Sequence, residues 1–383
     1  MKGIENVIKY RDKLLLLLAF LVLAAAIFLP AKPRVFPKVT SVVFTHWWNE
    51  DLGEEILADL IKEFEELHDG IKIVLSSISY EDMLHGFFDS PENPKGDVYA
   101  LDPLWVPELQ KLGIAEDFSS PFTSFLDVFY YNIDILKEAG FSRPPKTRSE
   151  FLNYSRAVSK IEKKYSALVV DKEDPRWIYD NVYPWIWSSG TMLMDDGRPE
   201  VNSRQVIDSF SFLAALNSEG LIVFGNKLEN FYSGNAAFMI SSGKDLNLVR
   251  EHLGDDSFSI SSVPAPDNYA GKFYYGIAAW TIGISSASPH KEEARLFADF
   301  LVKNASIFSK KTGALEAMPD MDALHLKMWD IAITGEPARE FYDLPWMIEK
   351  EKIFQEEIML LFSQEITAVE AAESIQAKWE ALY

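Results

Sequence analysis

From residue 41 onward, short apolar runs alternate with longer amphipathic stretches. Residues 41–45 (SVVFT), 71–75 (IKIVL) and 97–101 (DVYAL) are rich in β-branched and apolar side chains, which is typical of buried strands. Between the first two runs, apolar side chains recur at helical spacing until Gly70 ends the stretch; they are Ile56, Leu57, Leu60, Ile61, Phe64 and Leu67. This order predicts βαβ units, which form a parallel sheet with helices on both faces.

A second α/β block follows with the same alternation. Thr147 and Glu150 have the spacing of a capping box and predict a helix that runs to about residue 164. The remaining pattern predicts further strands at 167–170, 236–240, 258–263 and 277–284, and helices at 132–140, 203–216 and 289–302. Two helices are expected in the tail, the second starting at another capping box formed by Thr367 and Glu370. The sequence therefore predicts an α/β protein.

The N-terminal segment reads as a targeting signal rather than as part of the fold. Four basic residues, Lys2, Lys9, Arg11 and Lys13, precede an apolar run over 14–29. The run is shorter than the ~20 residues of a spanning helix, and it contains three consecutive alanines of the kind found at cleavage sites. Residues 1–29 are predicted to be either a cleaved signal peptide or an uncleaved membrane anchor. Either one places the rest of the chain outside the cytoplasm. Residues 30–38, with three prolines, are expected to form a stiff spacer.

Charge and composition exclude several classes of protein. The formal net charge of -21 repels nucleic acid, so we expect no nucleic-acid partner. The chain has no cysteine, which excludes disulfides, thiolate metal sites and a lipoprotein anchor. It also lacks a phosphate loop, a Gly-x-Ser-x-Gly elbow and a His-Glu-x-x-His pair. We therefore predict no catalytic residues, no metal site and no cofactor.

Aromatic residues beside polar ones are the most informative candidates for a site. The chain has ten tryptophans, and several follow the ends of predicted strands, where open parallel sheets bind their ligands. Indole rings cover the apolar faces of a sugar, while carboxylates and amides bond its hydroxyls. The predicted ligand-binding residues are Trp47, Trp48, Asn49, Glu50, Asp102, Trp105, Trp185, Trp187 and Trp346. Trp280, in the middle of a predicted strand, is expected to serve packing instead.

Two tyrosine pairs invite a different interpretation, a ferric-ion site. The pairs are Tyr130–Tyr131 and Tyr274–Tyr275. Adjacent residues of a strand face opposite sides of the sheet, so one tyrosine of each pair is expected in the core. This geometry disfavours iron.

Five blocks of sequence carry a resemblance to a known family. They are 129–140 (FYYNIDILKEAG), 144–151 (PPKTRSEF), 183–190 (YPWIWSSG), 231–239 (FYSGNAAFM) and 282–294 (IGISSASPHKEEA). With these blocks, the chain from about Ser41 to its C-terminus resembles the extracellular solute-binding protein family 1, the maltose-binding-protein-like group that serves sugar ABC transporters.

The resemblance implies a type II periplasmic-binding-protein fold. In that fold two lobes, each a mostly parallel sheet flanked by helices, enclose the ligand in the cleft between them by hinge closure. We expect lobe one at 39–122 plus 270–333 and lobe two at 123–269 plus 334–383. The resemblance further implies that the ligand is a small polar molecule, a sugar, and that ABC permease subunits are the partners. It also implies a monomer that lies in the periplasm or at the cell surface.

The sequence also departs from the family pattern. Arg148 stands where a tryptophan is usual, and residues 241–244 (SSGK) replace a segment that often carries a sugar-stacking tryptophan. The stretch from Gly113 to Tyr131 is shorter than in family members, as if a helix near the hinge were missing.

Two alternative functions remain open on the sequence alone. A secreted glycoside hydrolase would use the same tryptophans with a pair of carboxylates across the cleft. A sensory or scaffolding paralogue that does not serve transport would fit an N-terminal anchor and the shortened stretch before Tyr131.

Overall fold

The computed structural model describes residues 39–383 except 53, 90–94, 163–164, 313, 315–320 and 342–346. Residues 1–39 form a separate unit, so the fold described below is that of Thr40–Tyr383. The predicted signal or anchor at 1–29 and the spacer at 30–38 lie outside the described residues. Within the described part of the chain, no helix combines the length and the apolar character needed to span a membrane.

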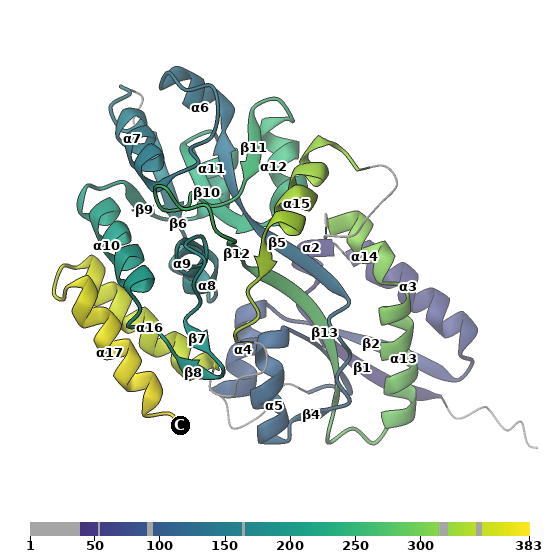
Figure 1. Ribbon diagram of the computed structural model, residues 1–383. Coiled ribbons are helices and arrows are strands. Elements are labelled where there is room, and N and C mark those ends of the chain that lie inside the picture. Colours follow the sequence, from purple (N-terminus) through teal and green to yellow (C-terminus); the bar gives the residue numbers. More distant parts are fainter. Residues whose placement is uncertain are drawn as a thin grey trace, which may run out of the picture. The chain divides into compact units, whose positions relative to one another are not determined.

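A ten-stranded sheet runs through the described unit (Figure 1). Its path is β2 (Ile71–Ser77), β1 (Thr40–His46), β3 (Val98–Leu101), β13 (Ile277–Ser285), β5 (Thr123–Asn132), β10 (Ala236–Ser242), β6 (Ser166–Val170) and β9 (Ile222–Phe224). Two short members pair beside this path, β4 (Ala115–Glu116) with β13 and β11 (Phe258–Ser261) with β5. Two small two-stranded sheets complete the described strands: β7 (Met194–Asp195) pairs with β8 (Arg198–Pro199), and β12 (Tyr274–Tyr275) pairs with β14 (Glu336–Pro337).

The strand directions divide this sheet into two parallel groups joined by antiparallel strands. β1 pairs in parallel with β2 and β3, and β6 pairs in parallel with β10 and β9. Between them, β13 is antiparallel to β3 and to β5, and β5 is antiparallel to β10. The long strands β13 and β5 therefore carry the chain from one group to the other.

The first group is covered by helices. These helices are α2 (Asn49–Leu52), α3 (Glu54–Leu67), α4 (Tyr80–Phe88), α5 (Val106–Leu112), α13 (Lys291–Lys303) and α14 (Ala305–Thr312). Two of them, α3 and α13, were predicted from the sequence. On α3, the buried side chains are Leu57, Leu60 and Phe64. Phe297 of α13 packs edge-on against Phe64 and against Phe44 of β1, which joins the two helices to the sheet.

The second group carries more helices, several of them at the C-terminal end of the chain. They are α6 (Ile133–Glu138), α7 (Arg148–Val158), α8 (Trp177–Asn181), α9 (Tyr183–Trp187), α10 (Arg204–Ser218), α11 (Lys227–Tyr232), α12 (Leu246–Leu253), α15 (Ala323–Thr334), α16 (Met347–Phe362) and α17 (Ala368–Glu380). The predicted capping box at Thr367 and Glu370 is confirmed at the start of α17. At α7, the Thr147 hydroxyl accepts from the Glu150 amide as predicted, while the Glu150 carboxylate accepts from Arg143 and from the Lys146 amide.

Helix α15 packs against β11 and β5, in a separate apolar cluster. Met328 and Ile331 of this helix share the cluster with Tyr130, while the neighbouring Tyr131 lies in the main core. The two tyrosines thus face opposite sides of β5, as predicted from strand geometry. By sequence position α15 falls in the predicted first lobe, yet it contacts strands of the predicted second lobe. The lobe bounds stay a prediction.

The packing of α16 and α17 onto α10 generates a prediction about stability. Trp379 is fully buried, packs against Phe354, and donates from Nε1 to the Lys350 carbonyl at 3.1 Å. Replacing Trp379 by alanine leaves a cavity and removes the hydrogen bond to Lys350, so we expect the free energy of unfolding to fall by about 3–5 kcal/mol. Urea unfolding followed by circular dichroism measures it.

Val369→Ala on the same helix is the matched control, because Val369 is exposed. It should change the free energy of unfolding by no more than about 0.5 kcal/mol. An unchanged urea midpoint for Trp379→Ala would show that α17 does not contribute to the cooperative core.

Candidate functional site

A cavity of about 340 Å³ lies where β1 and β3 end and faces residues of the second group of strands. Trp47 follows β1 and Asp102 follows β3, whereas Ala278 and Trp280 come from β13. The opposite wall belongs to the segment before α8, to α11 and to the end of β10; its members include Arg176, Asp180, Lys227, Ser241 and Asp245. The cavity therefore sits at the carboxyl ends of parallel strands, the edge where such sheets bind ligands.

Three aromatic rings form one corner beside this cavity. The ring centroids of Trp47 and Tyr80 are 5.2 Å apart and perpendicular, and those of Tyr80 and Trp105 are 4.8 Å apart. Trp105 turns toward a second cavity and does not line the first. The corner is consequently rigid, since each ring is packed against the other two.

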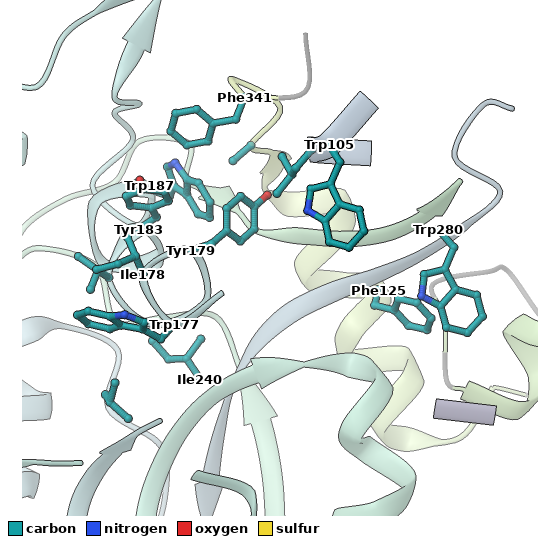
Figure 2. Packing of buried hydrophobic residues seen from close by; sticks show 14 of the residues in the cluster. Trp105, Phe125, Trp177, Ile178, Tyr179, Tyr183, Trp187, Ile240, Trp280 and Phe341 are labelled. Carbon is teal, nitrogen blue, oxygen red and sulfur yellow. The ribbon is translucent and has the colours of Figure 1, made fainter. Parts of the chain in front are cut away.

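Trp280 and Phe125 form the other aromatic wall, and Figure 2 shows their rings next to each other. Their centroids are 5.2 Å apart, and behind Trp280 the ring of Trp48 stacks at 4.6 Å. Trp280 was expected to serve packing only, and it does pack, but it also lines the cavity. Its position on β13, one of the two strands that join the parallel groups, places an indole at the base of the site.

A chain of ion pairs crosses the cavity. Arg176 Nη1 bonds Asp102 Oδ2, and Tyr80 donates its hydroxyl to the same oxygen at 3.0 Å. Arg176 Nε lies 3.5 Å from Asp180 Oδ1. Lys227 Nζ continues the chain, at 3.4 Å from Asp180 Oδ2 and 3.5 Å from Asp174 Oδ2. We call the five residues Asp102, Arg176, Asp180, Lys227 and Asp174 the ion-pair chain.

Burial and mutual charge set the protonation of these groups. Burial acts to lower the pKa of Lys227, but the Asp180 and Asp174 carboxylates raise it above its ordinary value. The pKa of Arg176 is likewise raised, because Asp102 and Asp180 outweigh the effect of burial. Both cations are therefore held in the charged form.

A buried carboxyl, Asp127 of β5, lies near the ion-pair chain but outside it. Burial raises its pKa to about 8, and the negative charge of Asp180 adds to the shift. Neither of its oxygens has a hydrogen-bond partner among the described residues, and one packs so closely on Gly276 that a side chain there would clash. Asp127 is thus protonated at neutral pH and adds no charge to the site.

A second cavity, of about 410 Å³, lies on the other side of Arg176. It is lined by Leu84 and Phe88 of α4, by Trp105, by Tyr179 of α8 and by Glu351 of α16. Arg176, Tyr80 and Asp174 line both cavities. The Asp102–Arg176 pair therefore stands between two hollows of similar size. Burial raises the pKa of Glu351 to about 8, so this carboxyl is mostly protonated at neutral pH.

The structure brings only some of the predicted site residues to these cavities. Trp47 and Asp102 line the first and Trp105 lines the second. Trp48 was expected to be exposed in a cleft; it is instead fully buried, because the start of α2 turns its ring between Phe44 and Trp280. Asn49 is half-buried and lines neither cavity.

Two more predicted residues lie in the core. Trp185 and Trp187 are fully buried on α9, and neither lines a cavity. Trp187 packs against Tyr179 and Tyr183, as Figure 2 shows, and its Nε1 donates to Glu340 Oε1 at 2.7 Å. Both residues belong to a short helix that packs against α8, α10 and α16. The side chain of Glu50 and all of Trp346 lie outside the described residues.

The residues that sequence reasoning missed come from the second group of strands. Asp174 and Arg176 follow β6 directly, in the segment 171–176 (DKEDPR). The strand-end rule that found Asp102 therefore applied to them as well, and only the search for tryptophan passed over them. Lys227, at the start of α11, carries no comparable signal, because a lysine that begins a helix is ordinarily exposed.

Arg148 explains one departure from the family pattern. Its guanidinium is buried, donates to the Trp185 carbonyl and to Ser209 Oγ, and lies 5.3 Å from the ring centroid of Phe212. Burial lowers its pKa to about 10, which leaves it charged at neutral pH. Arg148 thus fills a structural position next to Trp185 and is not part of the cavity.

A known protein family and individual proteins resemble this chain. A family model described as "Bacterial extracellular solute-binding protein" matches residues 49–307. The sn-glycerol-3-phosphate-binding periplasmic protein UgpB of Pectobacterium atrosepticum is 28% identical over 217 residues, which are 51% of this chain and 47% of that protein. UgpB of Escherichia coli strain K12 is 26% identical over 51% of this chain and 48% of its own length. The chain thus spans about half the length of the curated relatives it matches.

Solved structures share the fold. The GacH receptor of Streptomyces glaucescens superposes with a TM-score of 0.76 at 14% identity, covering 90% of this chain and 98% of that one. UgpB from Mycobacterium tuberculosis in complex with glycerophosphocholine gives a TM-score of 0.75 at 15% identity, covering 89% and 98%. The predicted α/β two-lobed binding-protein fold is confirmed. The family model matches more than half of the residues of this chain. The chain therefore belongs to the bacterial extracellular solute-binding protein family.

Proposed function

We propose that this chain is an extracytoplasmic solute-binding protein that captures a small polar solute, a carbohydrate, and delivers it to an ABC importer. The observation that supports this most directly is the cavity at the strand ends. It combines indole faces from Trp47 and Trp280 with charged hydrogen-bonding groups from Asp102, Arg176 and Asp180. Apolar ring faces and a rim of hydroxyls are the two features of a sugar that such walls complement.

Capture in this proposal works by closure of two lobes. Lobe one is 39–122 plus 270–333 and lobe two is 123–269 plus 334–383, with β5 and β13 connecting them. Helix α15 is the exception to these bounds: it falls within the range of lobe one but packs on β11, and in this proposal it moves with lobe two. Asp102 and Arg176 stand on opposite lobes, so a solute that contacts both is bound fully only when the lobes are closed. Such a solute shifts the population toward the closed form, which the permease then recognises.

The proposal includes two further statements. The chain is a binding protein and not an enzyme, as members of its family are. Its N-terminal segment, 1–29, either exports the chain and is removed or stays as a tether, so the binding unit works in the periplasm or at the cell surface as a monomer.

Solute binding should raise the thermal stability of the protein. A ligand that binds only the folded state stabilises it by mass action, by about 2.7 kcal/mol at 100 times its dissociation constant. We expect at least one mono- or oligosaccharide to raise the melting temperature in a concentration-dependent way, measured by differential scanning fluorimetry and then by calorimetry.

Amino acids, peptides and polyamines serve as the comparison set in this screen. A response to one of them, with none to any saccharide, would contradict the carbohydrate assignment. Release of reducing sugar during incubation with oligosaccharides would contradict the statement that the chain is not an enzyme.

Breaking the pair that crosses the cavity should weaken both folding and capture. Arg176→Gln leaves Asp102 without its buried cation and Asp180 with Lys227 alone, and loss of one partner of a buried ion pair costs ~3 kcal/mol or more. We expect a lower urea midpoint and a weaker saccharide-induced rise in melting temperature than for the unaltered protein.

Arg204→Gln is the control for this change. Arg204 also pairs with an aspartate, Asp208, but its side chain is 91% exposed. This substitution should alter the free energy of unfolding by no more than about 0.5 kcal/mol and leave saccharide binding unchanged. Equal effects of the two substitutions would show that the cross-cavity pair has no special role.

A further inference from the structure

The cations on the wall of the first cavity all act on aspartates, among the residues that the structure describes. Arg176 bonds Asp102 and Asp180, and Lys227 lies within 3.5 Å of two aspartates. The third cation, Lys244, acts on Asp174. Burial works to raise the pKa of Asp174, but Lys227 and, less strongly, Lys244 bring it below its ordinary value.

The two cations of the ion-pair chain cannot easily exchange their aspartate partners for a ligand. The side chains of Arg176 and Lys227 are 14% and 6% exposed, and those of Asp102 and Asp180 are 5% and 10% exposed. Removing one partner from a buried pair leaves the other charge uncompensated, which is strongly unfavourable. Neither cation can therefore turn to a ligand anion without leaving an aspartate charged and unpaired.

The charge of the wall as a whole is negative. The lining holds five carboxylates and three cations: three aspartates and two cations belong to the ion-pair chain, and Asp245, Glu81 and Lys244 complete the set. A phosphate ester carries about -1.5 to -2 charges at neutral pH. It would meet an acidic, partly dehydrated wall in which like charges repel strongly.

Neutral hydroxyls, in contrast, find donors and acceptors here. Arg176 Nη2 is buried and has no hydrogen-bond partner within the described part of the chain. Arg176 as a residue borders both cavities, and Nη2 is the end of its guanidinium that bonds neither Asp102 nor Asp180. The paired carboxylates keep lone pairs for hydroxyl hydrogens.

We propose that the ion-pair chain makes this cleft select an uncharged, polyhydroxylated solute and reject phosphate esters, although the curated relatives that match half of the chain are sn-glycerol-3-phosphate-binding proteins. Asp174 and Asp180 are the specificity-determining residues, because they occupy the cations that a phosphate would otherwise use. The inference rests on the proposed solute-binding function and names the class of solute.

The test compares ligands that differ in charge on the full chain. The probes are sn-glycerol 3-phosphate, glucose 6-phosphate and maltose 1-phosphate, set against glycerol, glucose, maltose and longer uncharged saccharides. Binding is followed by melting temperature and by titration calorimetry. The unaltered chain should respond to at least one uncharged saccharide and to none of the phosphate esters.

Two substitutions then free Arg176 and Lys227 from an aspartate partner. Asp180→Asn removes an acceptor shared by Arg176 and Lys227, and Asp174→Asn removes one from Lys227 at a less buried position, 30% exposed. At least one of the two variants should bind a phosphate ester at least tenfold more tightly than the unaltered chain does, and that binding should weaken as salt is raised. Far-UV circular dichroism checks that each variant is folded.

Asp208→Asn provides the matched control, because it removes an equal charge from an aspartate that is 63% exposed on α10, away from the cavity. It should gain no affinity for phosphate esters. The inference is overturned if the unaltered chain binds a phosphate ester more tightly than any uncharged solute, or if both folded variants gain nothing. Failure of every solute of either kind to bind would instead sink the proposed function, and this inference with it.

Discussion

The buried contact between Asp102 and Arg176 is the interaction on which the site depends. Asp102 follows β3 in one group of parallel strands, and Arg176 follows β6 in the other. Their pairing joins the carboxyl ends of the two groups across the antiparallel strands β13 and β5. A buried ion pair is a weak source of net stability but a strong constraint on geometry, since its loss leaves charges unpaired. It therefore defines how the two walls of the cavity face each other.

Aromatic packing supplies the frame around this pair. Tryptophan is large enough to serve two purposes at once: Trp280 lines the cavity with one face and stacks on Trp48 with the other. Trp47 and Trp105 similarly hold Tyr80, whose hydroxyl donates to Asp102. Side chains fixed in this way are preorganised for a ligand, because little conformational entropy is left to lose on binding.

The sequence predicted the elements of the fold better than the members of the site. Short apolar runs located β1 and β2, and apolar periodicity located α3, which buries a single stripe made of Leu57, Leu60 and Phe64. It did not locate β5, whose residues are buried along almost the whole strand and so show no alternation. The shortened stretch before Tyr131 was noticed as a missing helix, and in the structure this stretch is occupied by β5 itself.

Among site residues, position after a strand was a better guide than residue type. Asp102 was found by that rule, and Arg176 follows β6 in the same way. Residue type was a poor guide for Trp185 and Trp187, which were predicted to bind ligand but are buried in the core. An indole packs in an apolar core as readily as against a sugar face. Nothing local distinguishes these cases, since burial of α9 depends on helices that are far away in the sequence, α10 and α16.

Native mass spectrometry of the full chain, titrated with uncharged oligosaccharides and purified without harsh washing, tests the central claim most directly. The account predicts a stoichiometric mass increment equal to one uncharged, polyhydroxylated molecule, which is lost in Arg176→Gln but kept in Arg204→Gln. An increment that matches a phosphate ester, or one that survives Arg176→Gln unchanged, would contradict it.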